Sequence, residues 1–258
     1  MRCRPKILCR SGAVAMSDEF DEIVGDIDGE LDLTLYTDSD ELSDEVTAQI
    51  LLAIENGLLA ESEFHLVLTG GTLGVQISRS LVAAFNGAPE LYKGLHIWFS
   101  DERFVDSHSS ERNAAPWHNT LTNHNIVVHE ALATDSPATI ENAVTHYQEA
   151  LAGVTIDLNI LGVGPDGHVA SLFPGIADID DQRDIFAITD SPKPPAARIS
   201  FTMKFLNEAR EIWIVAAGEG KADAVAKIIE GDLSIPASYV SAELRTRLIV
   251  DQAAFFTE

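Results

Sequence analysis

Short, almost wholly apolar segments recur along this chain, and each is followed by glycine or polar residues and then by a segment with helical periodicity. The clearest of them cover residues 64–68, 95–99, 156–161 and 212–216, the last within a strand expected over residues 211–216. Continuous apolar runs of this length are typical of strands that are buried on both faces of a parallel sheet. Strands that alternate with helices favour an α/β architecture. We therefore expect a three-layer, doubly wound, mostly parallel Rossmann-like sheet with helices on both faces.

Weaker segments complete this alternation. Further strands are expected at residues 31–36, 126–129, 184–189, 199–201 and 247–250. Helices are expected from about Ser43 to residue 58, and over residues 73–85, 110–121, 136–151 and 221–229. Pro116 should interrupt the third helix, whereas Pro137 suits the first turn of the fourth, where a missing N–H costs little. Because no repeat and no Gly/Ser linker occurs, residues 31–258 are predicted to form a single domain.

Residues 1–30 are expected to be an extension outside this domain. The first 15 residues are basic, and Arg10 interrupts the apolar stretch that a signal peptide would need. We interpret them as a disordered extension, or as sequence that precedes a start at Met16. Cys3 and Cys9 are the only cysteines, so a disulfide framework is excluded and a reducing, cytoplasmic location is expected.

The charge balance excludes several classes of partner. The chain carries 41 Asp and Glu against 17 Lys and Arg, a formal net charge of −24. Nucleic-acid-binding proteins need a basic footprint, and anionic membranes attract basic rather than acidic surfaces. No apolar run reaches the roughly 18 residues that a membrane span requires. A small-molecule partner is expected instead, for a chain that acts as a monomer or a small homo-oligomer.

No metal or cofactor site is indicated. His118, His124 and His129 lack the spacing of metal-binding histidines. Residues 162–167 match the dinucleotide pattern G-x-G-x-x-G, but that pattern needs a long helix that starts within it, and Pro174 follows almost at once. We therefore reject a dinucleotide-binding interpretation of these glycines.

Two segments lie where parallel sheets bind ligands, beyond the carboxyl ends of strands. Gly70, Gly71 and Thr72 follow one strand and open a helix, so their N–H groups and the hydroxyl suit a phosphate; a tight strand–helix turn is the alternative. Asp166 and His168 follow another strand on a glycine-bent loop, and an imidazole beside a carboxylate suits proton transfer.

Cations are scarce in this chain, yet four of them fall beside strand ends. They are Arg103, Lys193, Arg198 and Lys221. Arg binds phosphate through bidentate hydrogen bonds and Lys binds it as a point charge, so the pattern suits a small anionic substrate. For the triplet Asp101-Glu102-Arg103, taken alone, a surface ion pair is the alternative interpretation.

Four segments together resemble the 6-phosphogluconolactonases, hydrolases of the oxidative pentose phosphate pathway. The segments are residues 69–72 (TGGT), 98–103 (WFSDER), 161–175 (LGVGPDGHVASLFPG) and 191–202 (SPKPPAARISFT). The resemblance covers about residues 31–251. It implies hydrolysis of 6-phospho-D-glucono-1,5-lactone to 6-phosphogluconate, without cofactor or metal.

The same resemblance implies a role for each candidate residue. His168 would accept a proton from water, with Asp166 orienting the loop. Phosphate contacts would come from Gly70, Gly71, Thr72, Arg198 and Lys221. Further substrate contacts would come from Arg103 and Lys193.

Two alternatives remain. The first is the glucosamine-6-phosphate deaminases, which share the Gly-x-Asp-Gly-His turn. They have Asp-Glu-Tyr where this chain has Asp-Glu-Arg at residues 101–103. They have Ala-Phe-Asn-Glu-Pro where this chain has Ala-Ser-Leu-Phe-Pro at residues 170–174. A departure in the other direction is Leu73, where lactonases commonly have Pro. A non-catalytic sugar-phosphate sensor is the second alternative, although no basic helical segment for DNA binding is present.

Overall fold

The largest element of the structure is a seven-stranded sheet in which every neighbouring pair of strands is parallel. The computed structural model describes residues 32–136 and 138–256. The strand order is β1-β10-β9-β6-β2-β3-β5. In chain order these strands are β1 (Asp32–Tyr36), β2 (Phe64–Leu68), β3 (Leu95–Phe99), β5 (Val127–Val128), β6 (Leu158–Gly162), β9 (Glu211–Ala216) and β10 (Arg245–Asp251). This sheet confirms the expected mostly parallel α/β fold.

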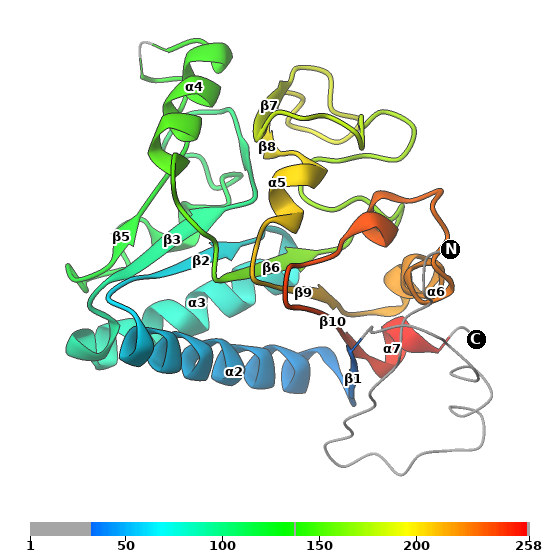
Figure 1. Cartoon of the computed structure of the whole chain (residues 1–258), viewed down its shortest axis with the longest axis horizontal. Helices are drawn as coiled ribbons and strands as arrows, with labels where there is room; N and C mark the ends of the chain where they lie inside the picture. Colours follow the sequence, from blue (N-terminus) through cyan, green and yellow to red (C-terminus); the bar gives the residue numbers. More distant parts are fainter. Residues whose placement is uncertain (1–31, 137, 257–258) are drawn as a thin grey trace.

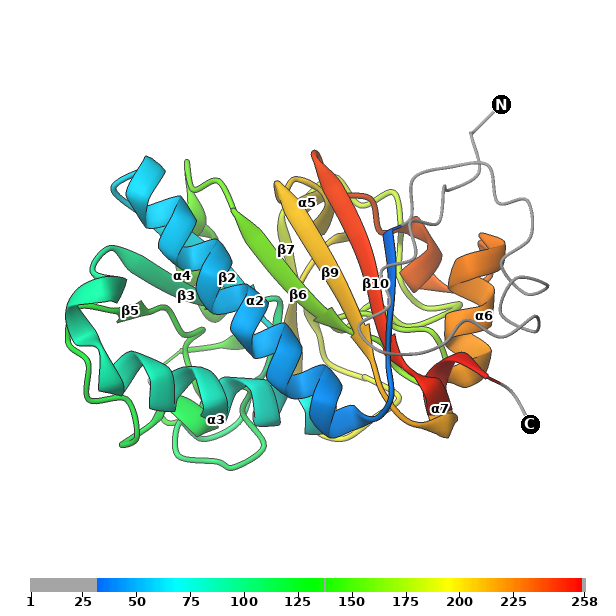
Figure 2. The same ribbon diagram turned by 90° about the horizontal axis from the view of Figure 1, so that it is seen from below.

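Helices cover both faces of the sheet (Figures 1 and 2). One face carries α2 (Ser39–Ala60) and α3 (Gly71–Gly87), whose buried side chains share an apolar cluster with β2 and β3. The opposite face carries α4 (Ile140–Leu151), α5 (Met203–Asn207), α6 (Ala222–Glu230) and α7 (Gln252–Phe255) around a second cluster. Alternate residues of the central strands enter each cluster, as the period of a strand requires. The sheet is therefore a middle layer between two apolar cores.

A second sheet was not expected from the sequence. It has three antiparallel strands in the order β4-β8-β7, with β4 at Asp101–Arg103, β7 at Ile185–Ile188 and β8 at Arg198–Phe201. Two of these strands, β7 and β8, were predicted at residues 184–189 and 199–201, but without a second sheet to hold them. The second sheet lies over the α4 face of the main sheet (Figure 1). Because β4 follows β3 after a single residue, it ties the carboxyl end of β3 to this second sheet.

Several helix boundaries also differ from those predicted. α2 begins at Ser39, because Asp38 caps it by accepting the N–H groups of Asp40 and Glu41, and Ser43 is buried inside the helix. α4 begins at Ile140, capped by Thr139 rather than started by Ser136. The helix boundary proposed at Pro137 falls on a residue outside those described, as does the extension proposed for residues 1–30.

The helix expected over residues 110–121 is reduced to one 3-10 turn, Ala115–Trp117. The carboxylate of Glu102 accepts the N–H groups of Asn113 and Ala114, at 2.7 and 3.1 Å. These N–H groups are therefore bound from outside the segment, and Pro116 removes another donor. Short helices at α5 and α7 were not predicted. Within residues 32–136 and 138–256, no helix is long and apolar enough to cross a membrane.

Candidate active site

Between β2 and β6 the direction in which the chain adds strands to the main sheet reverses, and a crevice is expected there. β2 is followed in the chain by β3 on one side of it, and β6 is followed by β9 on the other side. The loops that leave two such strands diverge, which opens a crevice at their carboxyl ends, and open α/β sheets bind ligands there. The segment after β2 carries residues 69–72, of which the last two begin α3, and the loop after β6 carries residues 163–168. The topology thus brings the two predicted loops together.

Gly70 and Gly71 form the start of α3. Gly70 is the residue before the first turn, and no side chain in the described part of the chain caps the N–H groups of that turn. Gly71 has a φ of +77°, a backbone conformation that glycine adopts without strain. The first turn carries no acidic side chain. An uncapped helix N-terminus free of negative charge is suited to bind an anion.

A cavity of about 610 Å³ adjoins this helix start. Gly70, Gly71 and Thr72 line one wall, and Lys221 lines another. Among residues 32–136 and 138–256, the Lys221 side chain has no hydrogen-bond or ion-pair partner. Burial lowers the pKa of Lys221, and the charge of Lys193 lowers it further, against the opposing effect of Asp166. A bound phosphate would therefore stabilise the charged form of Lys221.

His168 and Asp166 form a close pair on the loop after β6. Nδ1 of His168 lies 2.5 Å from Oδ1 of Asp166. Burial alone would raise the pKa of Asp166, but its hydrogen bond to His168, the charge on that ring and Lys193 outweigh burial and lower the pKa to about 2. Asp166 is therefore a carboxylate at neutral pH and can only accept. Nδ1 must then carry the proton, which leaves the Nε2 lone pair of His168 available as a base.

Lys193 completes this group. Its Nζ lies 3.1 Å from Oδ1 of Asp166 and 3.1 Å from Nδ1 of His168. Because Nδ1 holds a proton, we assign the Lys193 hydrogen bond to Asp166. Burial lowers the pKa of His168; Asp166 opposes this, and the charge of Lys193 reinforces it. His168 is therefore held in its neutral form near pH 7.

Arg198 lies apart from the cavity that Lys221 lines. Its guanidinium donates to the carbonyl oxygens of Lys193, Pro194 and Pro195, at 3.0, 3.2 and 3.1 Å. Its side chain is 4% exposed and lies 3.7 Å from the carboxylate of Asp101. These contacts shape the segment that delivers Lys193 to His168. The phosphate contact expected of Arg198 stays a prediction.

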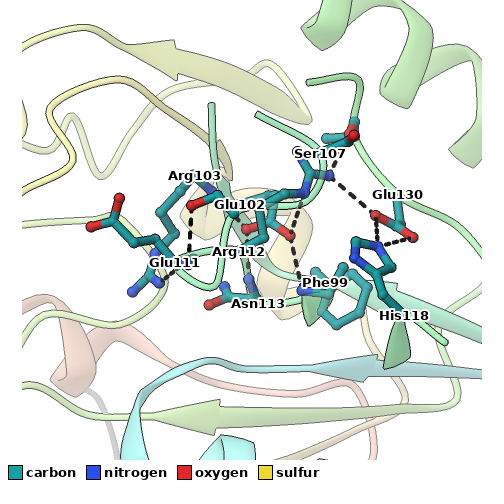
Figure 3. A network of polar contacts seen from close by, with 12 residues as sticks. Phe99, Glu102, Arg103, Ser107, Glu111, Arg112, Asn113, His118 and Glu130 are labelled. Atoms are coloured by element: carbon teal, nitrogen blue, oxygen red, sulfur yellow. Dashed lines mark hydrogen bonds and ion pairs between the residues drawn. The ribbon is translucent and has the colours of Figure 1, made fainter. Parts of the chain in front are cut away.

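The triplet that forms β4 is mostly buried, so the surface ion pair considered for it is wrong for its two acids. Asp101 is 6% exposed and Glu102 is 2% exposed. Glu102 lies 3.7 Å from Arg112, within a polar network that reaches Glu130 (Figure 3). Burial raises the pKa of Glu102, while Arg112 and three backbone N–H groups oppose that effect. Arg103 donates to the carbonyl oxygen of Glu111 and lies opposite Arg198 in the second sheet.

Two residues of the site escaped sequence reasoning. Gly164 packs against the imidazole, since a Cβ built on it would lie 1.9 Å from Nδ1 of His168. Its place in the pattern of residues 162–167 was a usable signal. Asn113 is buried beside Gly70, and nothing in the local sequence indicated it. Within the described ranges, no group of three or more His, Cys, Asp or Glu side chains is arranged to hold a metal ion.

The fold and the site define an α/β protein with an anion-compatible helix N-terminus and a His–Asp pair at one crevice, an arrangement suited to a phosphorylated substrate. The family model described as glucosamine-6-phosphate isomerases/6-phosphogluconolactonase matches residues 37–249. The 6-phosphogluconolactonase of Streptomyces coelicolor is 33% identical over 245 residues, which cover 86% of this chain and 92% of that protein. The 6-phosphogluconolactonase of Rattus norvegicus is 38% identical over 69% of this chain and 73% of its own length.

A solved structure agrees with these relatives. The crystal structure of 6-phosphogluconolactonase from Thermotoga maritima superimposes with a TM-score of 0.72 at 26% identity, over 85% of this chain and 99% of that one. The chain therefore belongs to the glucosamine-6-phosphate isomerase/6-phosphogluconolactonase family. Within that family it is an enzyme of the lactonase branch.

Proposed function

We propose that this enzyme hydrolyses 6-phospho-D-glucono-1,5-lactone to 6-phosphogluconate, with His168 as the general base. The observation that carries the proposal is the pairing of Nδ1 of His168 with ionised Asp166, next to a cavity that joins a helix N-terminus to Lys221. Family membership supports the reaction, since the relatives named above are 6-phosphogluconolactonases.

The phosphate of the substrate would lie in the cavity lined by Gly70, Gly71, Thr72 and Lys221. The phosphate is remote from the ester, so its binding energy can hold the lactone carbonyl beside His168 without taking part in the chemistry. Lys193, held at Asp166, lies 3.1 Å from Nδ1 of His168 and close enough to Lys221 for its charge to lower the pKa of that lysine. Arg103 and Arg198 would add contacts from the second sheet.

The reaction then proceeds in two proton transfers. A water oxygen bonds to C1 of the lactone while Nε2 of His168 takes one proton from that water. The resulting imidazolium is stabilised by the carboxylate of Asp166, 2.5 Å from Nδ1. When the bond between C1 and the ring oxygen breaks, the imidazolium returns the proton to that oxygen. The product is the open-chain acid, and His168 is neutral again. Such general acid–base assistance contributes about 10²–10⁴-fold to a rate.

A coupled assay tests the proposal. Glucose-6-phosphate dehydrogenase generates the lactone, 6-phosphogluconate dehydrogenase consumes the product, and the second formation of NADPH is followed with and without this protein. We expect a clear acceleration over spontaneous ring opening, and a loss of about 10²–10⁴-fold in His168→Ala with unchanged folding. No acceleration by folded protein would exclude the lactonase, and ammonia release from glucosamine 6-phosphate would then be measured.

A further inference from the structure

Asn113 connects the two loops of the site, although it belongs to neither. Asn113 is 3% exposed. On one side it contacts residues 69–72, which we call the glycine loop, since a Cβ built on Gly70 would lie 1.9 Å from Oδ1 of Asn113. That Oδ1 atom is buried and accepts no hydrogen bond from residues 32–136 and 138–256. The contact between the Asn113 amide and Gly70 is therefore a packing contact and not a hydrogen bond.

On its other side Asn113 holds Asp101. Its Nδ2 donates to the carbonyl oxygen and to Oδ1 of Asp101, at 2.8 and 3.0 Å. The second carboxylate oxygen of Asp101 accepts the hydroxyl of Ser171 at 2.6 Å. Ser171 lies three residues after His168, in a loop closed by bridges that pair Val169 with residues 163 and 172. Contacts thus run from Gly70 through Asn113 and Asp101 to the loop that carries His168.

Buried polar contacts keep Asn113 in place. Glu102 accepts the N–H of Asn113 at 2.7 Å and the N–H of Ala114 at 3.1 Å. Arg112 lies beside Glu102 and donates to the carbonyl oxygen of Ala131 at 2.7 Å (Figure 3). Buried hydrogen bonds of this kind fix one conformation, because leaving any of the groups unpaired is costly. Movement of Asn113 would therefore break a hydrogen bond of the buried Glu102 carboxylate, and this holds Asn113 in one position.

We propose that Asn113 is a positioning residue that sets the glycine loop relative to the His168 loop. The proposal rests on the proposed function, because the distance between these loops matters only if one binds the phosphate and the other carries the base. A displacement of about 1 Å in such an arrangement can reduce a rate by about 10²-fold. Removal of the Asn113 side chain should therefore weaken both substrate binding and turnover.

Asn113→Ala tests the proposal, with Asn123→Ala as the matched control. Asn123 is 4% exposed and donates from Nδ2 to the carbonyl oxygens of Phe85 and Pro89, so its loss also removes buried hydrogen bonds. It does not line the Lys221 cavity. We expect kcat/KM for the phosphorylated lactone to fall at least about 10-fold in Asn113→Ala and to stay within about 2-fold in Asn123→Ala. Equal losses in both variants, or no loss in Asn113→Ala, would overturn the proposal.

Hydrogen exchange measured by mass spectrometry separates this proposal from the proposed function. In Asn113→Ala, peptides that cover residues 69–74 and 164–172 should both exchange faster, and neither should change in Asn123→Ala. Faster exchange confined to residues 101–117 would contradict the linkage, whatever the activity. If both loops loosen but the wild-type protein hydrolyses no lactone, the linkage stands and the proposed function fails. Asn113→Ser, whose hydroxyl can still donate to Asp101, serves the same comparison if Asn113→Ala does not fold.

Discussion

Gly164 lies in direct contact with the imidazole of His168. A Cβ built on Gly164 would lie 1.9 Å from Nδ1 of His168 and 2.5 Å from Oδ1 of Asp166, both far below any permitted separation. The N–H of Gly164 also donates to the carbonyl oxygen of His168 at 2.8 Å. The loop after β6 therefore folds back so that its own backbone forms one wall of the His–Asp pair, and only a residue without a side chain leaves room for that pair.

Gly164→Ala should inactivate the enzyme while the acid–base residues themselves stay in the sequence. The added methyl group must push the imidazole away from Asp166, which breaks the hydrogen bond at Nδ1. We expect kcat to fall about 10²-fold or more, and the free energy of unfolding to fall by about 1–3 kcal/mol. Kinetics and urea unfolding check both values. Gly87→Ala is the control, because a Cβ there meets no atom of the described residues within 4 Å. Wild-type kcat in Gly164→Ala would mean that the pair is not needed.

The acidic limb of the pH profile of kcat/KM should depend on the charges of Asp166 and Lys193, which lie beside His168. The base must be neutral, so activity is lost as the pH falls through the pKa of His168, which burial lowers below 6.5. Asp166 raises that pKa and Lys193 lowers it. Lys193→Met should therefore move the acidic limb of the profile to higher pH, and Asp166→Asn should move it to lower pH. Lys227→Met, which removes a charge from α6, should leave the limb in place. Shifts in the reverse directions would refute the assigned contacts.

The sequence predicted the main sheet well because its strands are buried on both faces. β2, β3 and β9 have the predicted boundaries, since each is dominated by an apolar run with a polar residue or a glycine within two positions of its end. The two loops of the site were predicted for the same reason: they follow strands whose positions were clear. The second sheet was not recognised, because β4 is only three residues long and its sequence, Asp-Glu-Arg, is that of a solvated turn.

Long-range contacts explain the remaining errors. The buried Glu102 binds backbone N–H groups of residues 113 and 114, and no local pattern reveals partners eleven and twelve residues away. The phosphate contact of Arg198 stays a prediction, and residue type did not indicate that its guanidinium also donates to carbonyl oxygens of the segment before it. Residue type predicted the chemistry available at the site, whereas the partner of each group is decided by tertiary packing.

Stability should rise with pH between about 4 and 6.5, in part because of His129. Burial, reinforced by His96 and His65, lowers the pKa of His129 to about 4. Between that value and the ordinary 6.5, the unfolded chain binds the proton at His129 and the folded chain does not. The contribution of neutral His129 to the free energy of unfolding is therefore fully present above pH 6.5 and decreases as the pH falls toward 4. One such group contributes a slope of at most about 1.4 kcal/mol per pH unit.

His129→Gln should reduce this slope, measured as the free energy of unfolding in urea at pH 5 and at pH 7. His146→Gln is the control, since His146 is exposed on α4 and should leave the slope unchanged. The stacking of His129 on Trp98, with ring centroids 3.6 Å apart, supplies a second readout in tryptophan fluorescence over the same range. Identical slopes in wild type and His129→Gln would show that another group is responsible.

Lys221→Met should weaken recognition of the phosphate specifically. The Lys221 ammonium lines the same cavity as the start of α3 and has no ion-pair partner in the described part of the chain. A hydrogen bond to a charged group contributes about 1.5–3 kcal/mol, which corresponds to about 10–150-fold in kcat/KM. The loss should appear with 6-phospho-D-glucono-1,5-lactone and not with unphosphorylated glucono-1,5-lactone, because Lys221 is assigned to the phosphate alone. Lys227→Met, on the helix that follows Lys221, removes the same charge and should leave the ratio of the two activities unchanged. An equal loss on both lactones would place Lys221 at the ester, and the proposed orientation of the substrate would have to be reversed.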